Sequence, residues 1–372
     1  MPQSNSSSYY AIGLMSGSSL DGLDITYCKY THEPSSSEKS PWSFLLLEAK
    51  TAKLGPWEEK LRAAIHLLPE ELDELSVEFS FYLAEQVKDF IDEFQLRNID
   101  VVVSHGHTIY HYPEEGRSCQ IGDGETLAKY LDLSVVNNLR QEDINHGGQG
   151  APIVPIGDKY LFQDYQFCLN IGGIANISVR QDSELIAFDI CAANQVLNYY
   201  AKKCGLPYDD KGKLARKGNL NKVLLESLNQ LDFYKREYPK SLDNAFSKQA
   251  ISIINDVECD EKNALNTYVE HLAIQISSNI KTIARRQSLS ISESASMLIT
   301  GGGAFNTYLI ERIVVNSELN VIIPPADIIN YKEAIVMGFI GVLRMRDEVN
   351  VLASVTGAYK DTSCGDIYLP KS

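Results

Sequence analysis

The sequence predicts an α/β protein, and three observations support this fold class. Short apolar runs, typical of buried strands, alternate with longer segments of helical spacing along the 372 residues. A strand–turn–strand unit at residues 10–30 recurs in kind at residues 167–180. The length suffices for two domains of ordinary size, each with its own core. We therefore expect two related domains, each built from α/β layers.

Composition narrows the class of protein. A formal net charge of −15 argues against broad binding to DNA, RNA or an anionic membrane, since these need clustered Lys and Arg. The seven cysteines include no Cys-x-x-Cys pair, so neither a disulfide framework nor a thiolate zinc site is expected. Residues 1–8 are polar and are expected to be disordered, and no run of about eighteen apolar residues occurs. A cytoplasmic protein without a nucleic-acid or membrane partner is expected.

The first hairpin encloses the most informative loop. Its two apolar runs flank Gly17-Ser18-Ser19-Leu20-Asp21-Gly22, and Asp24 follows. The backbone N–H groups and hydroxyls of such a loop can bind an anion, and a carboxylate there can hold Mg²⁺. This is the chemistry of a nucleotide phosphate site. Because Gly, Ser and Asp are also the commonest turn residues, an ordinary hairpin turn explains the loop equally well by itself.

The elements after this hairpin follow from local patterns. A polar surface loop at 32–41 precedes a strand at 43–48, and helical spacing then extends from 56 to about 97. A strand at 101–103 leads into the run from Ser104 to Thr108. Further helices are expected near 125–131, 193–204, 220–231, 246–257, 262–286 and 333–346. Further strands are expected at 134–137, 167–171, 177–180, 186–189, 297–300 and 321–323.

Two more glycine loops resemble the first in kind. Gly172-Gly173-Ile174-Ala175-Asn176 joins the strands of the second hairpin. If this turn and the first one face each other across a cleft, a polyphosphate can lie between them. Gly301-Gly302-Gly303 follows an apolar strand and opens a helix, a context that favours a nucleotide over a simple turn. Each loop is a weak signal alone, and three of them at strand ends are considerably stronger.

Asp189 is the carboxylate with the most informative position. It ends the apolar run 185–188, and open α/β folds bind ligands at the carboxyl ends of buried strands. A general base and an N-cap of the following helix both remain open as roles for it. In the polar tract 140–152, Arg140 can form a bidentate contact with a phosphate or carboxylate. Alternatively, the tract is a surface connection in which Arg140 and Asp143 pair with each other.

Three histidines invite comparison with a metal site. His105, His107 and His111 recur at alternate positions, which share one side of a strand. No carboxylate or cysteine completes a four-ligand set at the usual spacing, so a structural role is favoured and no structural metal is expected. Asp123, after Gln120-Ile121-Gly122, is a second candidate carboxylate, or simply a turn or cap residue.

Taken in order, these motifs resemble one family, the anhydro-N-acetylmuramic acid kinases of the actin, hexokinase and Hsp70 superfamily. The matching segments are collinear over nearly the whole chain: 12–22, 104–106, 120–123, 147–152, 170–176, 188–189, 240–241, 301–304, 333–334 and 355–358. The resemblance implies two actin-like (ribonuclease H-like) domains with mixed sheets flanked by helices around a central cleft. The first domain is expected at 9–131 plus about 335–372, and the second at 132–334.

The resemblance also implies an activity. Enzymes of this family use ATP and Mg²⁺ to open the anhydrosugar 1,6-anhydro-N-acetylmuramic acid, a fragment recycled from peptidoglycan. Water attacks the anomeric carbon, and the bridging oxygen, freed as O6, takes the γ-phosphoryl group to give N-acetylmuramic acid 6-phosphate. The family tends to form homodimers.

Residue roles follow by position in the family's motifs. Asp189 matches the general base that activates the water. The ATP site is implied at Gly17, Ser18, Ser19, Leu20, Asp21, Gly22, Asp24, Gly172, Gly173, Asn176, Gly301, Gly302 and Gly303, with Asp21 as a Mg²⁺ ligand. Substrate contacts are implied at His105, Gly106, Arg140, Asp143 and Glu333.

The chain also departs from the family pattern. Ile190-Cys191-Ala192-Ala193 stands where the family has Thr-Gly-Pro-Gly. Other departures are Asn138 for Asp, Glu142 for Arg, His107 for Gln and Ser19 for Thr. Two other functions therefore stay open, a kinase for another 1,6-anhydrosugar such as levoglucosan, and a non-catalytic homologue that binds ATP or a sugar.

Overall fold

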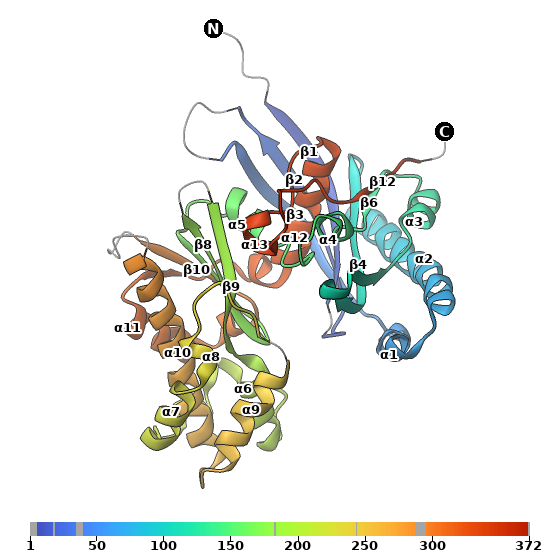
Figure 1. The fold of residues 1–372 in the computed structure, drawn as a ribbon. Helices are drawn as coiled ribbons and strands as arrows, with labels where there is room; N and C mark the ends of the chain where they lie inside the picture. The colour runs from blue at the N-terminus through green and yellow to red at the C-terminus, as the bar shows by residue number, and fades with distance from the viewer. Residues whose placement is uncertain are drawn as a thin grey trace. The chain divides into compact units, whose positions relative to one another are not determined.

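The structure is a computed structural model that describes residues 6–17, 19–34, 40–181, 184–242, 244–286 and 295–370. The chain forms two compact units, each with its own sheet and helices (Figure 1). Unit 1 comprises Met1–Gln163 and Tyr331–Ser372, and unit 2 comprises Asp164–Asn330. The predicted α/β fold class is confirmed, since each unit combines a mixed sheet with helices. No helix in the described ranges has both the length and the apolar content to cross a bilayer.

The sheet of unit 1 has the order β12-β6-β4-β1-β2-β3, and β5 pairs with β4. Among the first three strands, β1 and β3 run antiparallel to β2, whereas β4 is parallel to β1 and β6 is parallel to β4. The strand bounds are β1 (Ser7–Ser16), β2 (Leu23–His32), β3 (Trp42–Ala52), β4 (Val101–Tyr112), β5 (Arg117–Ile121), β6 (Val135–Asn137) and β12 (Asp366–Tyr368).

The sheet of unit 2 repeats this plan in the order β11-β10-β7-β8-β9. Three antiparallel strands come first along the chain, and β10 then pairs in parallel with β7 and β11 with β10. The bounds are β7 (Phe167–Ile171), β8 (Ile174–Gln181), β9 (Glu184–Ala192), β10 (Ser296–Thr300) and β11 (Asn320–Ile322). The recurring hairpin in the sequence thus marks a duplicated topology, as expected for actin-like domains.

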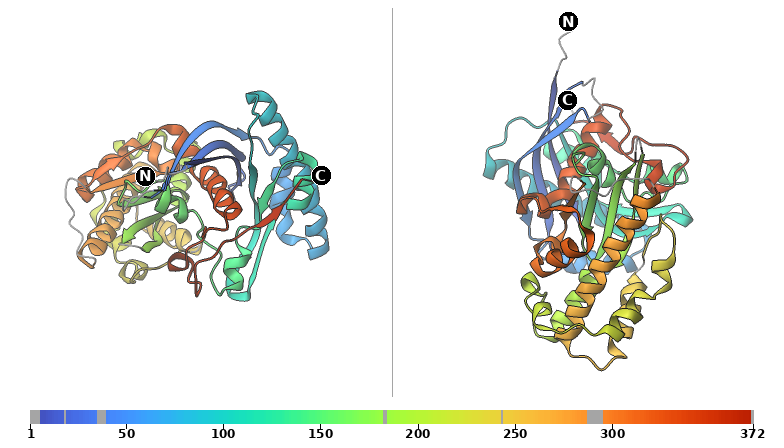
Figure 2. Two further views of the ribbon diagram at one scale, coloured as in Figure 1. Left: turned by 90° about the horizontal axis from the view of Figure 1, so that it is seen from above. Right: turned by 90° about the vertical axis from the view of Figure 1, so that its left-hand side faces the viewer.

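Helices cover both faces of the sheet of unit 1. Figure 2 shows α2 and α3 on one side of its strands and α12 on the other. The bounds are α1 (Trp57–Ala63), η1 (Ala64–His66), α2 (Pro69–Phe94), η2 (Pro113–Glu115), α3 (Gly124–Leu131), α4 (Gln141–Asn145), α5 (Pro155–Tyr160), α12 (Ala326–Met345) and α13 (Ala353–Thr356). The helical segment predicted at 56–97 is broken before Pro69, because proline lacks an N–H and fits the first turn of α2.

Helix α12 lies unusually close to the sheet, and this places Glu333. A Cβ built on Gly13 of β1 would lie 2.0 Å from the carbonyl oxygen of Ala334, so a glycine is needed there. The Tyr30 hydroxyl also donates a hydrogen bond to the carbonyl of Ile335, at 2.5 Å. These contacts fix the turn of α12 that bears Glu333, whose charge reaches Asp21 and Asp24 near the first glycine loop.

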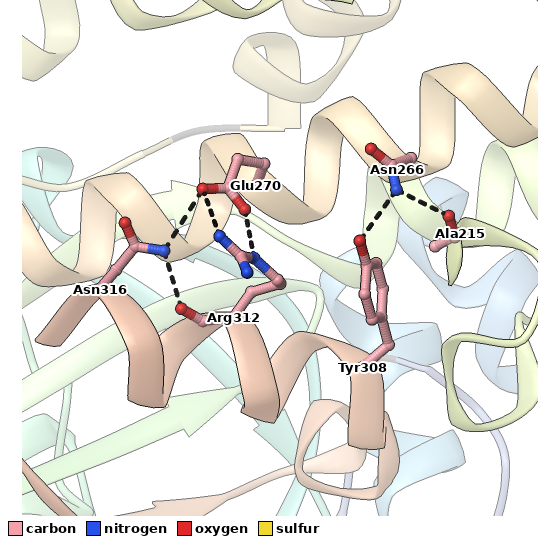
Figure 3. Close-up of polar contacts among 6 residues, drawn as sticks. All are labelled: Ala215, Asn266, Glu270, Tyr308, Arg312 and Asn316. Carbon is pink, nitrogen blue, oxygen red and sulfur yellow. Dashed lines mark hydrogen bonds and ion pairs between the residues drawn. The ribbon is translucent and has the colours of Figure 1, made fainter. Parts of the chain in front are cut away.

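In unit 2 a buried helix, α10, is central to the core. The bounds are α6 (Asn194–Lys203), η3 (Asp210–Gly212), η4 (Ala215–Lys217), α7 (Lys222–Asn229), α8 (Asp232–Lys235), α9 (Asn244–Asn255), α10 (Glu261–Arg286), η5 (Gly302–Phe305) and α11 (Thr307–Ser317). Glu270 of α10 accepts two hydrogen bonds from Arg312 of α11, at 2.6 and 3.1 Å (Figure 3). Asn266 donates to the Tyr308 hydroxyl at 2.9 Å. These contacts fix α11, and with it the glycine loop that precedes it.

The division into units differs from the sequence-based domain boundaries. The expected boundary after residue 131 lies instead after Gln163, because β6 pairs with β4 and β12 in the sheet of unit 1. The second boundary falls at Tyr331 rather than near 335. Ser7 and Ser8 belong to β1 rather than to a disordered tail, whereas residues 1–5, like 35–39 of the polar loop, lie outside the described residues.

Candidate active site

In unit 1 the loop between β1 and β2 is a compact turn. The N–H of Leu20 donates to the carbonyl of Gly17 at 3.1 Å, and Leu20 has a φ of 57°. The Ser19 hydroxyl donates to Asp21 Oδ1 at 2.7 Å, which orients an exposed carboxylate. Ser18, predicted to bind phosphate, lies outside the described residues. The loop has the ordinary geometry of a turn and presents one carboxylate to solvent.

Asp24 adds a second, more enclosed carboxylate near this loop. Burial raises its pKa to about 6, against a hydrogen bond from the Thr51 hydroxyl at 2.6 Å, and the charges of Asp21 and Glu333 raise the pKa further. In the described ranges no three His, Cys, Asp or Glu side chains are arranged to hold a metal ion. An ion bound here would also need water molecules and phosphate oxygens of a nucleotide as ligands. Mg²⁺ in proteins is usually coordinated in this way. Asp21 and Asp24 fit a Mg²⁺ that arrives with a nucleotide.

Arg140 and His105 form the best-defined polar pair of unit 1. The guanidinium donates from Nε and Nη2 to Nε2 of His105, at 3.0 and 2.8 Å, and from Nη1 to the carbonyl of Gly150 at 2.7 Å. Burial and the charge of Arg140 lower the pKa of His105 to about 3, so the ring is neutral near pH 7. His105 therefore orients Arg140 and is unsuited to act as a general base.

Glu333 lies close enough to Arg140 for each to influence the other's pKa. Burial lowers the pKa of Arg140 to about 10, and the charge of Glu333 opposes this shift. The Glu333 side chain reaches solvent, yet partial desolvation raises its pKa, opposed by Arg140 and Lys332 and reinforced by Asp21. A guanidinium with unused N–H groups beside a carboxylate can bind sugar hydroxyls or an anionic group.

Asp143 does not have the exposure expected of a substrate contact. Its side chain is 0% exposed, and its oxygens accept from the Gly150 N–H and the Thr356 hydroxyl, both at 2.8 Å. Asp143 therefore joins the segment around Gly150 to α13. One alternative from the sequence was that Arg140 and Asp143 pair with each other. In the described part of the chain these two side chains form no ion pair, and each has other partners.

Gly106, also predicted to contact the substrate, is a position where the backbone requires glycine. Its φ is 71°, and a Cβ would lie 2.5 Å from the carbonyl of Ile121.

The three histidines are used within the protein, as the structural interpretation predicted. His107 Nδ1 lies 2.9 Å from the Ser16 hydroxyl, and His111 Nδ1 lies 2.8 Å from the Ser118 hydroxyl. Burial lowers the pKa of both rings. Asp123 is the N-cap of α3, with its carboxylate accepting from the Thr126 N–H at 2.8 Å.

In unit 2 a row of polar residues crosses four strands. Thr300 of β10 is paired with Asn170 of β7, Asn170 with Asn176 of β8, and Asn176 with Asp189 of β9. Cross-strand partners share one face of a sheet, so these four residues line the same edge region. The sequence pointed to Asn176 and Asp189 but missed Asn170 and Thr300, whose only signal was their place at the ends of apolar strands.

The second and third glycine loops come together beside this row. A Cβ on Gly301 would lie 2.8 Å from the carbonyl oxygen of Ile171, directly before Gly172. The carbonyls of Gly172 and Gly173 accept hydrogen bonds from the first N–H groups of α6, at 2.8 to 3.2 Å. The hairpin turn therefore occupies the N-terminus of α6, and that helix end is unavailable to a phosphate. Within the hairpin turn, the Gly172 N–H donates to the carbonyl of Ile174 at 3.2 Å.

Asp189 is held by the backbone of a distant segment. Its N–H donates to the carbonyl of Lys240 and its Oδ2 accepts from the N–H of Leu242, both at 2.9 Å. Burial raises its pKa, and the Leu242 hydrogen bond opposes that shift. The N-cap of α6 is Ala193, without a side-chain cap, so the alternative role of Asp189 as the cap is excluded. The sequence could not reveal the Leu242 donor, since a backbone N–H is present at nearly every residue.

A buried network explains one departure from the family pattern. Cys191 Sγ lies 3.1 Å from the Tyr234 hydroxyl, which lies 2.9 Å from Nε2 of His271. Asn229 Oδ1 completes the chain, 2.6 Å from Nδ1 of His271. Burial raises the pKa of Cys191 to about 12 and lowers that of His271 to about 3, so both groups are uncharged. The network ties β9, which bears Asp189, to α7, α8 and α10.

Each unit also contains a cavity. In unit 1 a cavity of about 180 Å³ is bounded by residues 104–106, 118–120, 122 and 137–138. In unit 2 a wider, open one of about 630 Å³ lies between α7, α8 and α9 and reaches Leu242. The first adjoins His105, and the second adjoins the donor to Asp189.

The chain is similar to proteins of one family over most of its length. The family model described as anhydro-N-acetylmuramic acid kinase matches residues 9–370. A relative of that name from Zymomonas mobilis subsp. mobilis is 32% identical over 82% of this chain and 83% of its own length. Another, from Sulfurimonas denitrificans, is 28% identical over 97% of this chain and 100% of its own. A third, from Haemophilus influenzae, is 29% identical over 96% and 97%.

Among solved structures, the chain is similar to component A of the (R)-2-hydroxyglutaryl-CoA dehydratase of Acidaminococcus fermentans. The TM-score is 0.43 and the identity 13%, with 89% of this chain and 95% of that chain covered.

Proposed function

The chain belongs to the anhydro-N-acetylmuramic acid kinase family, and on this premise we propose that it phosphorylates 1,6-anhydro-N-acetylmuramic acid with ATP. The product is N-acetylmuramic acid 6-phosphate, a step in the recycling of peptidoglycan. Hydrolytic opening of the anhydro bridge and transfer of the phosphoryl group occur together.

Asp189 supports this proposal most directly. It is a partly enclosed carboxylate at a strand end, with one oxygen held by the Leu242 N–H and a pKa raised by burial. A raised pKa brings a carboxylate closer to the working pH, where a general base is most effective. We assign it as the base that takes a proton from the attacking water.

The chemical step then balances as follows. Asp189 takes one proton of the water while the water oxygen bonds to the anomeric carbon. The bond from that carbon to the bridging oxygen breaks, and the freed O6 attacks the γ-phosphorus, so that ADP leaves. Phosphoryl transfer needs positioning and charge neutralisation more than covalent help from the protein. A well-placed base contributes about 10²- to 10⁴-fold in rate.

We assign the glycine loops to the nucleotide. Gly17 to Gly22 and Asp24 of unit 1, with Gly172, Gly173, Asn176 and Gly301 to Gly303 of unit 2, supply backbone donors and small side chains for the phosphates. Mg²⁺ bound with the triphosphate supplies charge neutralisation, and Asp21 is its proposed protein ligand.

We assign the sugar contacts to Arg140 and Glu333. Arg140 has N–H groups left over after its bonds to His105 and Gly150, and Glu333 presents an acceptor beside it. We assign an indirect role to His105, Gly106 and Asp143. Each is held by contacts within unit 1 and helps to position the residues that contact the sugar.

Turnover of the anhydrosugar by the purified protein tests this proposal. The wild type should convert 1,6-anhydro-N-acetylmuramic acid to its 6-phosphate in the presence of ATP and Mg²⁺. Asp189→Asn should lower kcat by about 10²- to 10⁴-fold and leave ATP affinity unchanged. The amide oxygen still accepts from Leu242, so the fold is kept. Asp232→Asn, at an exposed position of unit 2, is the matched control.

Two outcomes would count against the proposal. ATP binding without phosphorylation of any anhydrosugar at any Mg²⁺ concentration would favour a non-catalytic homologue. Turnover of levoglucosan in preference to the amino sugar would favour the alternative substrate.

We also propose that the protein is a cytoplasmic homodimer, as the family resemblance implies. Light scattering of the purified chain measures its mass and so tests the oligomeric state.

A further inference from the structure

The small cavity of unit 1 adjoins the proposed sugar contacts. His105 lines it and, through Nε2, also orients Arg140. Its volume of about 180 Å³ is below the 300–1,000 Å³ of pockets that enclose whole ligands. A cavity of this size beside a sugar site can enclose one substituent of the sugar.

The cavity wall is polar but uncharged. Its side chains are hydroxyls, amides, a thiol and the neutral ring of His105, whose proton lies on Nδ1 toward the Gly106 carbonyl. At its rim Asn138 donates to Asp366 Oδ2 at 2.8 Å, which places a carboxylate nearby. A carboxylate ligand would be repelled by the Asp366 carboxylate, and the described residues of the cavity wall include no Lys or Arg side chain to neutralise it. The cavity therefore favours a neutral polar group.

Ser118 and Gln120 give the cavity a definite hydrogen-bonding character. They are alternate residues of β5 and share one face of the strand. Gln120 Nε2 donates to the Ser118 hydroxyl at 2.7 Å, and Ser118 also contacts His111 Nδ1 at 2.8 Å. Among the described residues, Gln120 Oε1 has no partner, so it is an acceptor for an N–H group.

We propose that this cavity binds the acetamido group of the amino sugar and thereby distinguishes N-acetylated anhydrosugars from those with a hydroxyl at that carbon. An acetamido group is neutral and has one N–H, one carbonyl and a methyl group. The lactyl group of the same sugar carries a carboxylate and is excluded by the uncharged wall and Asp366. The inference rests on the proposed function and specifies how the substrate is recognised.

The test uses two pairs of sugars that isolate each substituent. 1,6-Anhydro-N-acetylglucosamine and levoglucosan differ only in the acetamido group, and adding the lactyl ether to the former gives the proposed substrate. Ser118→Leu fills the cavity and should lower the kcat/KM preference for the acetylated member of the first pair by about tenfold or more. It should leave the preference within the lactyl pair unchanged.

Two further variants guard against a general loss of structure. Gln120→Glu keeps the shape of the side chain and removes the amide, so it should weaken the same preference without filling the cavity. Ser43→Leu makes the same substitution on β3, at an exposed position on the opposite edge of the sheet, and should change neither preference.

An unchanged acetamido preference in Ser118→Leu, with the amino sugar still phosphorylated, overturns the inference and leaves the proposed function standing. Titration calorimetry with the first pair of sugars decides the matter even without turnover. The wild type should bind the acetylated sugar at least about tenfold more tightly than Ser118→Leu does. Equal affinities would also overturn the inference.

Discussion

Arg140 donates two hydrogen bonds to a single atom, Nε2 of His105, at 3.0 and 2.8 Å. Nδ1 of the same ring lies 3.1 Å from the carbonyl oxygen of Gly106 and so bears the ring proton. A neutral imidazole thus orients a largely buried cation, and the bonds to His105 and Gly150 leave two N–H groups of Arg140 for other acceptors. Burial is the main cause of the low pKa of His105, and the guanidinium charge, which a protonated ring would face, lowers it further.

Removing the acceptor at His105 should impair sugar binding more than catalysis. His105→Phe leaves Arg140 without its two bonds, and KM for the sugar should rise by about ten- to a hundredfold, since hydrogen bonds to charged groups contribute about 1.5–3 kcal/mol. His105→Gln retains an acceptor and should recover part of that loss. Steady-state kinetics measure both parameters, and equal losses in the two variants would contradict an orienting role.

Two buried histidines should make the protein sensitive to acid. His105 and His271 both have a pKa of about 3 when folded, against an ordinary value of 6.5. Between these values the unfolded chain binds protons that the folded chain does not, so stability falls as the pH decreases from about 6.5 toward 3. Each histidine should contribute a slope of about 1.4 kcal/mol per pH unit in that window.

Urea denaturation from pH 7 to pH 4 measures this dependence. His105→Gln and His271→Gln should each flatten the curve, whereas His66→Gln, at an exposed position, should leave it unchanged. If both histidine variants gave the same slope as the wild type between pH 6.5 and 4.5, neither ring would be held neutral.

Much of the fold could be predicted because its signals are local. The two hairpins and three glycine loops follow from turn chemistry, and the strands around them follow from apolar runs. The position of Asp189 near a strand end could be predicted in the same way, from the apolar run that precedes it. Asn170 and Thr300 join Asp189 only through strand register, which no local pattern reports.

The remaining features depend on long-range contacts. β6 is short and apolar, and its pairing with β4 and β12 places the segment that follows residue 131 in unit 1. Asp143 stands in a polar, glycine-rich tract that resembles a binding loop, but Thr356, far along the chain, uses its carboxylate. The donor to Asp189 is a backbone group of Leu242, which has no signature in the sequence.

The Tyr234 hydroxyl should stabilise unit 2 through the network under β9. Tyr234→Phe removes the hydroxyl that lies 2.9 Å from His271 Nε2 and 3.1 Å from Cys191 Sγ, and leaves His271 Nε2 with the weaker contact to Cys191 Sγ, at 3.7 Å. The free energy of unfolding should fall by about 1–3 kcal/mol, the usual cost of a buried group without a partner. Tyr199→Phe, where the side chain is 36% exposed, should cost less than about 0.5 kcal/mol. Similar denaturation midpoints for the two variants would argue against a stabilising network.

Asp24 should lower the stability of the fold near neutral pH. Its folded pKa of about 6 exceeds its ordinary value of 3.8, so the folded chain retains a proton that the unfolded chain releases. Stability therefore falls as the pH rises from about 4 to 6, and Asp24→Asn should restore on the order of 1 kcal/mol at pH 7.5, after allowance for solvent screening. The amide oxygen still accepts from Thr51.

The same substitution should weaken binding of Mg²⁺ with ATP, because one carboxylate is lost near the proposed phosphate loop. Denaturation at pH 4.5 and 7.5 and calorimetric titration with ATP separate the two effects. A variant less stable than the wild type at pH 7.5 would contradict the assignment of Asp24 as a carboxylate whose pKa is raised by burial.

Adjacent glycines in the third loop should separate the requirements of folding from those of nucleotide binding. Gly301 has a φ of 77°, and a Cβ there would lie 2.6 to 2.8 Å from Asn170 Oδ1 and the Ile171 carbonyl. Gly301→Ala should therefore cost about 1–3 kcal/mol in stability. At Gly302 the nearest neighbour of a Cβ is Asn194 Nδ2, at 3.8 Å, and φ is not positive, so Gly302→Ala should fold with wild-type stability. If the loop closely approaches the phosphates, Gly302→Ala should nevertheless weaken ATP binding about tenfold, and unchanged affinity with unchanged stability would remove Gly302 from the nucleotide site.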